Sequence, residues 1–266
     1  MKAIILSAGQ GRRLMPLTES VPKCCLMLEG KTLLGRQIDS LAANGVDEIV
    51  VVTGYGHQLV EDVVRDVAGD IQGIPVRTLY NPFYALSDNL GTCWVARKEM
   101  KAPFLLINGD TLFEPSTLDH LLSSDRSYPI TLATDSKGQY DSDDMKISAS
   151  GTQLNRVGKK LDLSIVNGES IGMMIFDQAG ADVFVQKVES LMTGPDGLVR
   201  WYLSAIDELA IEGLVGIRSI NGLGWCEVDD LADFAHAEKT VTAWSDQATG
   251  NAKHVSAGNE SIRRNL

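Results

Sequence analysis

The sequence predicts an α/β fold in which a doubly wound, mostly parallel sheet carries helices on both faces. Short apolar runs alternate with amphipathic stretches in the β-α-β-α-β order that builds such a sheet. Residues 48–53 are almost wholly apolar, as in a strand that is covered on both sides. Residues 3–6 form a similar run that leads straight into small residues. Because open α/β sheets bind ligands beyond the carboxyl ends of their strands, the turn after residue 6 is a candidate binding loop.

Apolar periodicity assigns the elements in chain order. Residues 31–45 have apolar side chains at helical spacing and end in Asn44-Gly45, a typical stop for a helix. Residues 145–150 and 153–158 alternate around a polar turn that contains Gly151, as the strands of a hairpin do. Further strands are predicted at 75–80, 104–107, 129–134 and 214–220. Further helices are predicted at 59–67 and 179–191, together with one that ends at residue 97, one that begins at residue 201 and one that ends at about residue 243.

Length and composition limit the class of protein. The 266 residues suffice for one large domain, expected over residues 1–243 with a lid inserted at about 135–170, followed by a polar, poorly ordered tail over 244–266. A hydrophobic share of 44% with 22% charged residues is typical of a soluble globular protein. The net charge of −11 argues against a general nucleic-acid binder. No apolar run is long enough to span a membrane and no signal peptide precedes the first strand, so a cytoplasmic location is expected.

The loop after the first strand has the composition of a phosphate-binding turn. Residues 7–11, SAGQG, are small or flexible, and their backbone N–H groups can surround an anion. Arg12, Arg13 and Lys23 add positive charge close to this turn. The dinucleotide and P-loop fingerprints each lack a required glycine here, so neither applies. The simpler alternative is a tight strand-to-helix turn with solvated arginines.

Residues 6–23, LSAGQGRRLMPLTESVPK, resemble the signature of a nucleotidyltransferase family. This family includes sugar-1-phosphate nucleotidylyltransferases and the phosphocholine cytidylyltransferases of bacteria. The resemblance extends over roughly residues 1–240 and implies the family's Rossmann-like fold with a small β-rich acceptor lid. It also implies transfer of a nucleoside monophosphate from a nucleoside triphosphate to a phosphate or phosphonate, with release of pyrophosphate. The implied nucleotide-binding residues are Leu6, Ala8, Gly9, Gly11 and Arg12, with Arg13 and Lys23 on the triphosphate.

Residues 81–92 are suited to grip a flat, hydrogen-bonding base. They resemble the family's base-recognition segment, and their N-P-x-Y-x-x-S-x-N form is closest to the branch that acts on phosphocholine-like substrates. Gly91-Thr92 retains part of the G-T-A pattern of sugar-phosphate members. A capped helix start at Ser87 or Asp88 is the alternative role of this stretch. The resemblance implies nucleotide contacts from Ser87, Asn89, Gly91 and Thr92.

Two carboxylates that lie far apart in the chain are candidate metal ligands. Asp110 follows a predicted strand and a glycine, and it matches the family's N/A-G-D aspartate. Mg²⁺ prefers few carboxylates together with water and substrate phosphates. Residues 225–230, WCEVDD, resemble the family's closing motif, which implies Asp229 as the second Mg²⁺ ligand with Glu227 alongside. The alternatives are a plain turn at Asp110 and a helix N-cap at Asp229.

Candidates for binding the acceptor lie in and around the predicted lid. Residues 143–146, DDMK, resemble a D-x-M-K stretch of the phosphocholine-like branch, in which Lys146 would hold the acceptor phosphate. A solvated acidic loop is the alternative. Aromatic faces together with carboxylates can enclose an aminoalkyl cation, although aromatic residues at helical spacing are more often core. The acceptor-binding candidates are Asp144, Lys146, Glu169, Trp201, Tyr202 and Glu227.

The expected function is a Mg²⁺-dependent cytidylyltransferase that moves CMP from CTP to a small phosphorylated or phosphonate amine, such as phosphocholine or 2-aminoethylphosphonate. The alternatives are a sugar-1-phosphate nucleotidylyltransferase that uses UTP, dTTP or GTP, and a nucleotide-binding regulatory domain without chemistry. Retention of Lys23, Asp110 and Asp229 favours an enzyme, and this mechanism requires the three residues to converge in space. No nucleic-acid or membrane partner is expected. The oligomeric state stays open, with a homodimer among the alternatives.

Overall fold

The computed structural model describes residues 1–71, 73–101, 103–123 and 127–245. Its centre is a nine-stranded sheet with the order β5-β4-β1-β6-β11-β8-β12-β10-β9. In chain order, these strands are β1 (Lys2–Ser7), β4 (Glu48–Thr53), β5 (Val76–Tyr80), β6 (Phe104–Asn108), β8 (Ile130–Asp135), β9 (Lys146–Ser150), β10 (Gln153–Gly158), β11 (Gly168–Phe176) and β12 (Val215–Ser219). Two short ribbons pair β2 (Met27–Leu28) with β3 (Lys31–Thr32) and β7 (Thr111–Phe113) with β13 (Trp225–Glu227).

Strands β5, β4, β1 and β6 are parallel neighbours, as the alternation of apolar runs predicts. The mostly parallel α/β fold is thereby confirmed. Strand β11 departs from the pattern because it runs antiparallel to both β6 and β8. Its nine residues are all buried, and burial on both faces carries no information about strand direction. The sequence therefore marked an apolar segment here without revealing the reversal.

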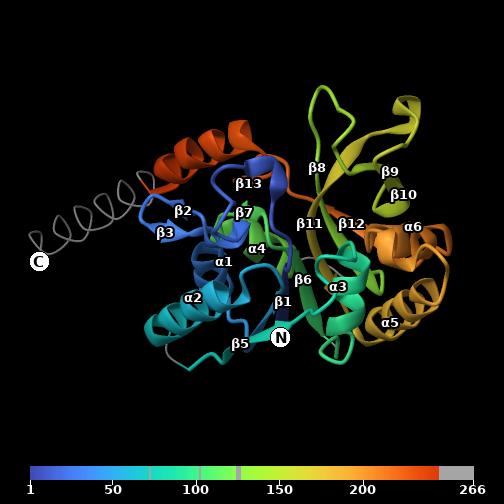
Figure 1. Ribbon diagram of the computed structural model, residues 1–266. Coiled ribbons are helices and arrows are strands. Elements are labelled where there is room, and N and C mark those ends of the chain that lie inside the picture. The colour runs from blue at the N-terminus through green and yellow to red at the C-terminus, as the bar shows by residue number, and fades with distance from the viewer. Residues whose placement is uncertain (72, 102, 124–126, 246–266) are drawn as a thin grey trace, which may run out of the picture.

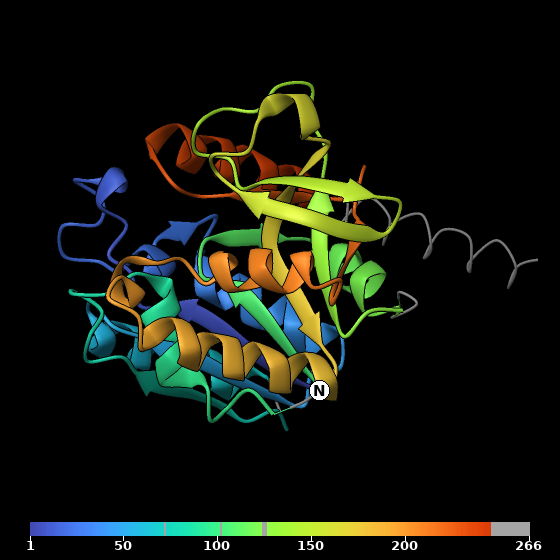
Figure 2. The ribbon, with the colours of Figure 1, turned by 90° about the vertical axis from the view of Figure 1, so that its right-hand side faces the viewer.

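Helices cover both faces of the sheet (Figures 1 and 2). Strand β1 shows why, because Ala3 and Ile5 pack into the apolar cluster of one face whereas Ile4 and Leu6 pack into that of the other. Successive side chains of a strand point to opposite faces, so a doubly covered strand must be apolar throughout. One face carries α1 (Leu33–Ala43), α2 (His57–Asp70) and α4 (Pro115–Leu122), and the other carries α3 (Asn89–Ala96), α5 (Gln178–Met192) and α6 (Leu203–Ile211).

A final helix over residues 231–245, drawn red in Figure 1, completes a third apolar cluster. Ala237 and Val241 of this helix pack with Leu14 and Leu28 from the beginning of the chain. The helix reaches the last described residue and so passes the predicted end near 243. The rest of the predicted tail, 246–266, lies outside the described residues. None of the helices in the described ranges is both long and apolar enough to cross a lipid bilayer.

The hairpin of β9 and β10 confirms the strands predicted at 145–150 and 153–158. Strand β10 packs against α6, as Figure 2 shows. The hairpin is joined to the main sheet, because β10 pairs with β12 and β9 pairs with the beginning of β11. The segment predicted as a lid thus extends the sheet, and its role over an acceptor stays a prediction.

Candidate active site

Two loops meet at the edge of the sheet where β1 and β6 end. The two strands are parallel and place Leu6 opposite Asn108, so residues 8–12 and Gly109-Asp110 leave the sheet side by side. The Gly109 N–H donates to the Leu6 carbonyl at 3.0 Å. A Cβ at Gly109 would lie only 2.5 Å from that carbonyl oxygen. The close approach of the two backbones therefore requires glycine at this position.

Lys23 reaches the same edge from a short 3-10 helix that begins at this residue. Its Nζ lies 2.8 Å from Asp110 Oδ2 and 2.7 Å from Asp229 Oδ1. Arg13 Nη2 lies 2.7 Å from the other oxygen of Asp229. The convergence of Lys23, Asp110 and Asp229 that the predicted mechanism requires is therefore present.

The β7–β13 ribbon explains how Asp229 comes to lie beside Asp110. Thr111 of β7 stands opposite Glu227 of β13, and the Val228 N–H donates to the Asp110 carbonyl at 3.1 Å. The carboxylates of Asp110, Glu227 and Asp229 each place one oxygen within 4.8 Å of the others. Backbone pairing between two segments that are distant in the chain thus assembles an acidic cluster.

The carboxyl groups of the acidic cluster and the nearby cations shift one another's pKa values. Burial disfavours the Lys23 ammonium, but Asp110 and Asp229 outweigh this effect and raise the pKa of Lys23. Burial also opposes the charged form of Asp229, yet Lys23 and Arg13 lower the pKa of this carboxyl. Glu227 is accessible from a cavity but surrounded by protein, and this desolvation, with Asp110 and Asp229 nearby, raises the pKa of Glu227 to about 8. The raised pKa of this carboxyl indicates that the negative charge of the cluster exceeds the positive charge around it.

The three carboxylates are suited to hold a divalent cation. Asp110 Oδ1 is buried and, among the described residues, has no hydrogen-bond partner. Such an orphaned oxygen is costly unless a cation or water satisfies it. Magnesium takes oxygen ligands, few of them carboxylates, and leaves positions for water and phosphate. The cluster of Asp110, Glu227 and Asp229 fits these preferences.

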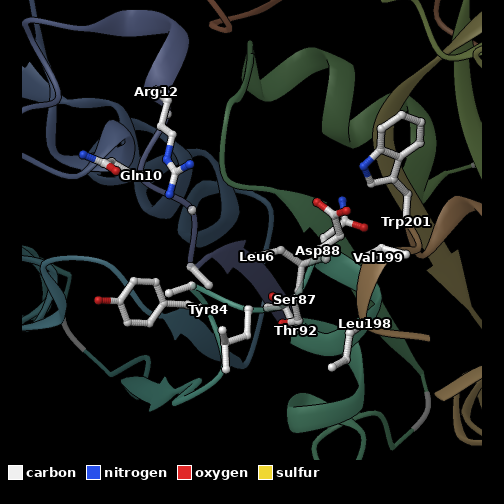
Figure 3. Close-up of a pocket in the computed structure, with 16 residues that line it drawn as sticks. Leu6, Gln10, Arg12, Tyr84, Ser87, Asp88, Thr92, Leu198, Val199 and Trp201 are labelled. Carbon is white, nitrogen blue, oxygen red and sulfur yellow. The ribbon is translucent and has the colours of Figure 1, made fainter. Parts of the chain in front are cut away.

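Three adjoining cavities open at this edge. The largest, about 520 Å³, extends from the loop after β1 to Trp201, and Figure 3 shows the side chains around it. The second, about 190 Å³, is lined by Lys23 and Asp110. The third, about 240 Å³, is lined by Asp110 and Glu227, among others. Asn89 lines all three, so the cavities meet at this residue.

The largest cavity contains most of the predicted nucleotide-binding residues. Gly11 has a φ of +76°, and a Cβ there would lie 2.9 Å from the Cβ of Lys23, so both backbone and space require glycine. Gly91 is the exception, because it is buried in α3 and does not line the cavity. A Cβ at Gly91 would lie 2.6 Å from the Ser87 side chain, which explains this glycine by packing. The predicted residues that line the cavity are Leu6, Ala8, Gly9, Gly11, Arg12, Ser87, Asn89 and Thr92.

Helix α3 begins at Asn89, as the predicted capping signal indicates, but Asp88 makes no side-chain capping hydrogen bond. The Ser87 hydroxyl instead donates to the Phe83 carbonyl at 3.1 Å. Asp88 is exposed and belongs to the cavity lining, where Figure 3 shows it between Ser87 and Trp201. The Asp88 side chain therefore lines the cavity and does not cap the helix.

The structure divides the predicted acceptor-binding residues. Trp201 and Glu227 line the third cavity. Lys146 is buried and donates to the backbone carbonyls of Asp144 and Lys159, at 3.1 and 2.8 Å. A buried ammonium must be paired within the protein, and this pairing corrects the expectation that Lys146 faces an acceptor phosphate.

Tyr202, Glu169 and Asp144 do not line any of the three cavities. Tyr202 is fully buried, and its hydroxyl donates to Asn108 Oδ1 at 2.9 Å. Glu169 and Asp144 share Lys137, whose Nζ lies 3.0 and 2.8 Å from their carboxylates. These contacts are internal to the protein, so the structure does not place the three residues where they were expected.

Asp143 and Lys159 also line the third cavity. Asp143 is the first residue of the D-x-M-K stretch, but neither Asp143 nor Lys159 was among the predicted acceptor-binding residues. Asp143 accepts hydrogen bonds from Arg13 and from Lys159, the latter at 2.8 Å. Lys159 Nζ also lies 4.7 Å from the centroid of the Trp201 ring. Asp143 stands directly before the predicted Asp144, and a run of acidic residues does not reveal which one faces inward. Lys159 carried no signal of its own, because lysines are common on surfaces.

Among curated proteins, the chain is 24% identical over 90% of its length to a CMP-5'-(3-aminopropyl)phosphonate synthase of Streptomyces rubellomurinus. It is 32% identical over 43% of its length to a choline-phosphate cytidylyltransferase of Streptococcus pneumoniae. The matches span only 38% and 47% of the lengths of these two relatives.

Solved structures share the fold. The inositol-1-phosphate CTP transferase from T. maritima superposes with a TM-score of 0.74 at 21% identity, covering 90% of this chain and 95% of the other. An apo UDP-glucose pyrophosphorylase superposes with a TM-score of 0.77 at 15% identity, covering 92% and 98%.

The profile of the MobA-like NTP transferase domain matches residues 3–215, a range that includes the loop after β1, Lys23 and Asp110. The resemblance to nucleotidyltransferases is thereby confirmed. The chain belongs to the family of MobA-like NTP transferase domains.

Proposed function

We propose that this protein is a Mg²⁺-dependent cytidylyltransferase that transfers CMP from CTP to a small phosphorylated or phosphonate amine, such as phosphocholine or 2-aminoethylphosphonate. The observation that carries the proposal is the convergence of Lys23, Asp110 and Asp229 beside three adjoining cavities. Family membership supports nucleotide transfer. The names of the two curated relatives described above support CMP as the transferred group and an amine-bearing acceptor.

The nucleoside of CTP is assigned to the largest cavity, and its phosphates to the adjoining cavity that contains Lys23. Gly9 and Gly11 line both cavities, and successive N–H groups of this loop can bind phosphate oxygens. The raised pKa of Lys23 keeps its ammonium charged at neutral pH. Lys23 and Arg13 would therefore exchange part of their pairing with aspartates for pairing with the triphosphate.

The chemistry requires little covalent participation by the protein. An acceptor oxygen forms a bond to the α-phosphorus, the bond from this phosphorus to the oxygen that bridges to the β-phosphate breaks, and pyrophosphate leaves with the electron pair. The attacking phosphate or phosphonate oxygen is already ionised at neutral pH, so no side chain has to remove a proton from it. Catalysis then rests on holding the reacting groups in line and on neutralising their charge.

Asp110, Asp229 and Glu227 are the proposed metal ligands. When bound, Mg²⁺ would supply charge neutralisation on the phosphates. The two aspartates have a second role that needs no metal. By forming ion pairs with Lys23, they hold its ammonium at the junction of the phosphate cavities.

The third cavity suits an acceptor that carries both signs of charge. Arg13 and Lys159 provide cations for a phosphate or phosphonate, while Asp143 provides a carboxylate for an amine. The exposed face of Trp201 adds an aromatic surface that attracts ammonium groups. A zwitterionic phosphoamine matches this mixture better than a neutral sugar ring does.

The test is pyrophosphate release from CTP, UTP, dTTP and GTP, each combined with phosphocholine, 2-aminoethylphosphonate and glucose 1-phosphate, with Mg²⁺ or with EDTA. We expect release from CTP with an amine-bearing acceptor, only with Mg²⁺, and loss of this activity in Asp110→Asn. Release confined to glucose 1-phosphate with UTP, dTTP or GTP would select a sugar-1-phosphate nucleotidylyltransferase. Nucleotide binding without release in any combination would select a regulatory domain.

A further inference from the structure

Tyr202 joins two asparagines that flank the phosphate cavities. Its backbone N–H donates to Asn89 Oδ1 at 2.8 Å, and its hydroxyl donates to Asn108 Oδ1 at 2.9 Å. Burial raises the pKa of the Tyr202 hydroxyl well above its ordinary value, so this donor remains protonated. The asparagines belong to α3 and β6, and Tyr202 directly precedes α6, so one residue connects three elements.

The bond from Tyr202 fixes how the Asn89 carboxamide is turned. A backbone N–H can only donate, so the side-chain atom that faces it must be the carbonyl oxygen. The NH₂ group of Asn89 consequently points away from the Tyr202 N–H. Within the described part of the chain, this NH₂ group finds no acceptor, although it carries two N–H donors.

The free donor lies at the junction of the cavities. Asn89 lines all three, and Asp110 lines two of them with it. Asn89 is also the first residue of α3, so the positive end of the helix dipole lies at the same point. An anion that extends from the nucleoside cavity toward the acidic cluster would pass this donor.

We propose that the Asn89 side chain is a catalytic residue that donates a hydrogen bond to the phosphoryl group during its transfer. This inference rests on the proposed nucleotidyl transfer and gives Asn89, which the resemblance implies only as a nucleotide contact, a role in the chemical step. Negative charge on the phosphoryl oxygens is redistributed as the bond to the leaving pyrophosphate breaks. A donor that the Tyr202 N–H holds in place beforehand stabilises this charge without reorganising. Asn89 itself neither gains nor loses a proton.

The Asn89→Asp variant tests the role of the NH₂ group. Aspartate has nearly the same shape and keeps an oxygen for the Tyr202 N–H, but it replaces the donor by an oxygen that repels phosphate. We expect kcat to fall about 100-fold or more. Binding of CTP, measured by titration calorimetry, should weaken by about tenfold, while the thermal midpoint stays close to that of the wild type. Asn155→Asp makes the same exchange on β10, outside the three cavities, and should leave kcat, CTP binding and the thermal midpoint unchanged.

A second variant separates catalysis from support of Tyr202. Asn89→Ala removes both the NH₂ group and the oxygen that holds Tyr202, and it should lower kcat and the thermal midpoint together. If Asn89 served only to hold Tyr202, Asn89→Asp would retain the kcat and the CTP affinity of the wild type. That result would overturn the proposal.

These experiments distinguish an error in the proposed function from an error in the role of Asn89. A wild type that binds CTP but releases no pyrophosphate with any acceptor contradicts the proposed function alone. CTP affinity then decides the role of Asn89, because an unchanged affinity in Asn89→Asp would exclude the phosphate contact. A wild type that binds none of the four nucleotides contradicts both.

Discussion

At the scale of single residues, Lys23 holds two carboxylates together through contacts of 2.8 and 2.7 Å. We predict that Lys23→Ala lowers kcat for pyrophosphate release by about 100-fold or more, because a cation is lost from the phosphate cavity and Asp110 is left facing Asp229. Steady-state assays measure this effect. Lys31→Ala, which removes a lysine paired with Asp39, is the control and should retain the wild-type rate. Wild-type kcat in Lys23→Ala would contradict the role of this lysine.

Asp110 leads to a prediction that does not depend on turnover. If the acidic cluster holds Mg²⁺, the cation should raise the thermal midpoint of the protein, since a ligand of the native state stabilises it. Asp110→Asn should lose most of this increase. Melting curves with and without Mg²⁺ measure the shift, and Asp119→Asn on α4 is the matched control. Equal shifts in both variants would remove Asp110 from the metal site.

Glu99 gives a pH dependence at the opposite end of the sheet. Burial disfavours its charged form, but Lys2, at 2.8 Å, and Arg77 outweigh burial and lower the pKa of Glu99. A lowered pKa in the folded state stabilises the protein above the ordinary pKa of glutamate, and this contribution is lost as the pH falls through the lowered value. We predict that Glu99→Gln costs about 1 kcal/mol of unfolding free energy at pH 7.

Urea denaturation at a series of pH values checks this prediction for Glu99. The difference between Glu99→Gln and the wild type should shrink as the pH falls below about 4.5 and vanish below the lowered pKa. A difference that stays constant down to strongly acidic pH would mean that shape, and not charge, makes position 99 important.

Single residues were predictable where a motif fixes them and unpredictable where burial decides. Lys23 and Asp110 were expected at one site because each lies in a short motif, and the structure brings them within 2.8 Å of each other. Lys146 and Tyr202 were expected in the acceptor site, but at the start of β9 and just before α6 they turn into the protein, where Lys146 binds carbonyls and Tyr202 binds Asn108. Which of two adjacent side chains faces a cavity depends on local twist that residue type does not encode, as Asp143 illustrates.

At the scale of elements, β11 has an irregularity beside the site. Its register against β8 shifts between Ser170 and Met174, and Gly172, which lies in this interval, has a φ of +72°. A Cβ at Gly172 would also collide with the Asn108 side chain. We predict that Gly172→Ala costs about 2 kcal/mol of unfolding free energy, measured by urea denaturation.

Gly158→Ala is the matched control for Gly172→Ala. Gly158 ends β10, and a Cβ there would meet nothing within 4 Å. Its substitution should stay within about 0.5 kcal/mol of the wild type. Equal stability of the two variants would show that the bend at Gly172 is not strained by a side chain.

Most elements were predictable because their apolar patterns repeat at the period of a strand or helix. The parallel order of β1, β4 and β5 follows from the helices between them, since parallel neighbours need a crossover. The direction of β11 was not predictable in this way. Its nine buried residues give no alternation, and its partners β6 and β8 come from earlier parts of the chain.

At the scale of the whole molecule, the site depends on contact between the beginning and the end of the described chain. Strand β13 brings Glu227 and Asp229 to Asp110, and the helix over residues 231–245 covers Leu14 and Leu28. We predict that a chain ended after residue 224 has no measurable turnover and a lower thermal midpoint, because it loses two carboxylates and uncovers an apolar cluster.

A chain ended after residue 245 is the control for this truncation, since it keeps all residues in the final described range. It should retain the wild-type kcat and thermal midpoint, as measured by the pyrophosphate assay and by circular dichroism. Turnover by the shorter chain would show that Asp229 is dispensable. The convergence of these distant segments was predicted only from the family resemblance. No local sequence pattern indicates which loops meet in space.

The distance along the chain between Lys23 and Asp229, 206 residues, also has a consequence in time. A ribosome makes the loop after β1 well before the segment that holds Asp229. Until that segment emerges, the lysine of a nascent chain lacks one of its two acidic partners. A nascent chain that lacks this segment would therefore hold an incomplete version of this centre, and the proposed reactivity toward nucleotides would require the segment to be made first.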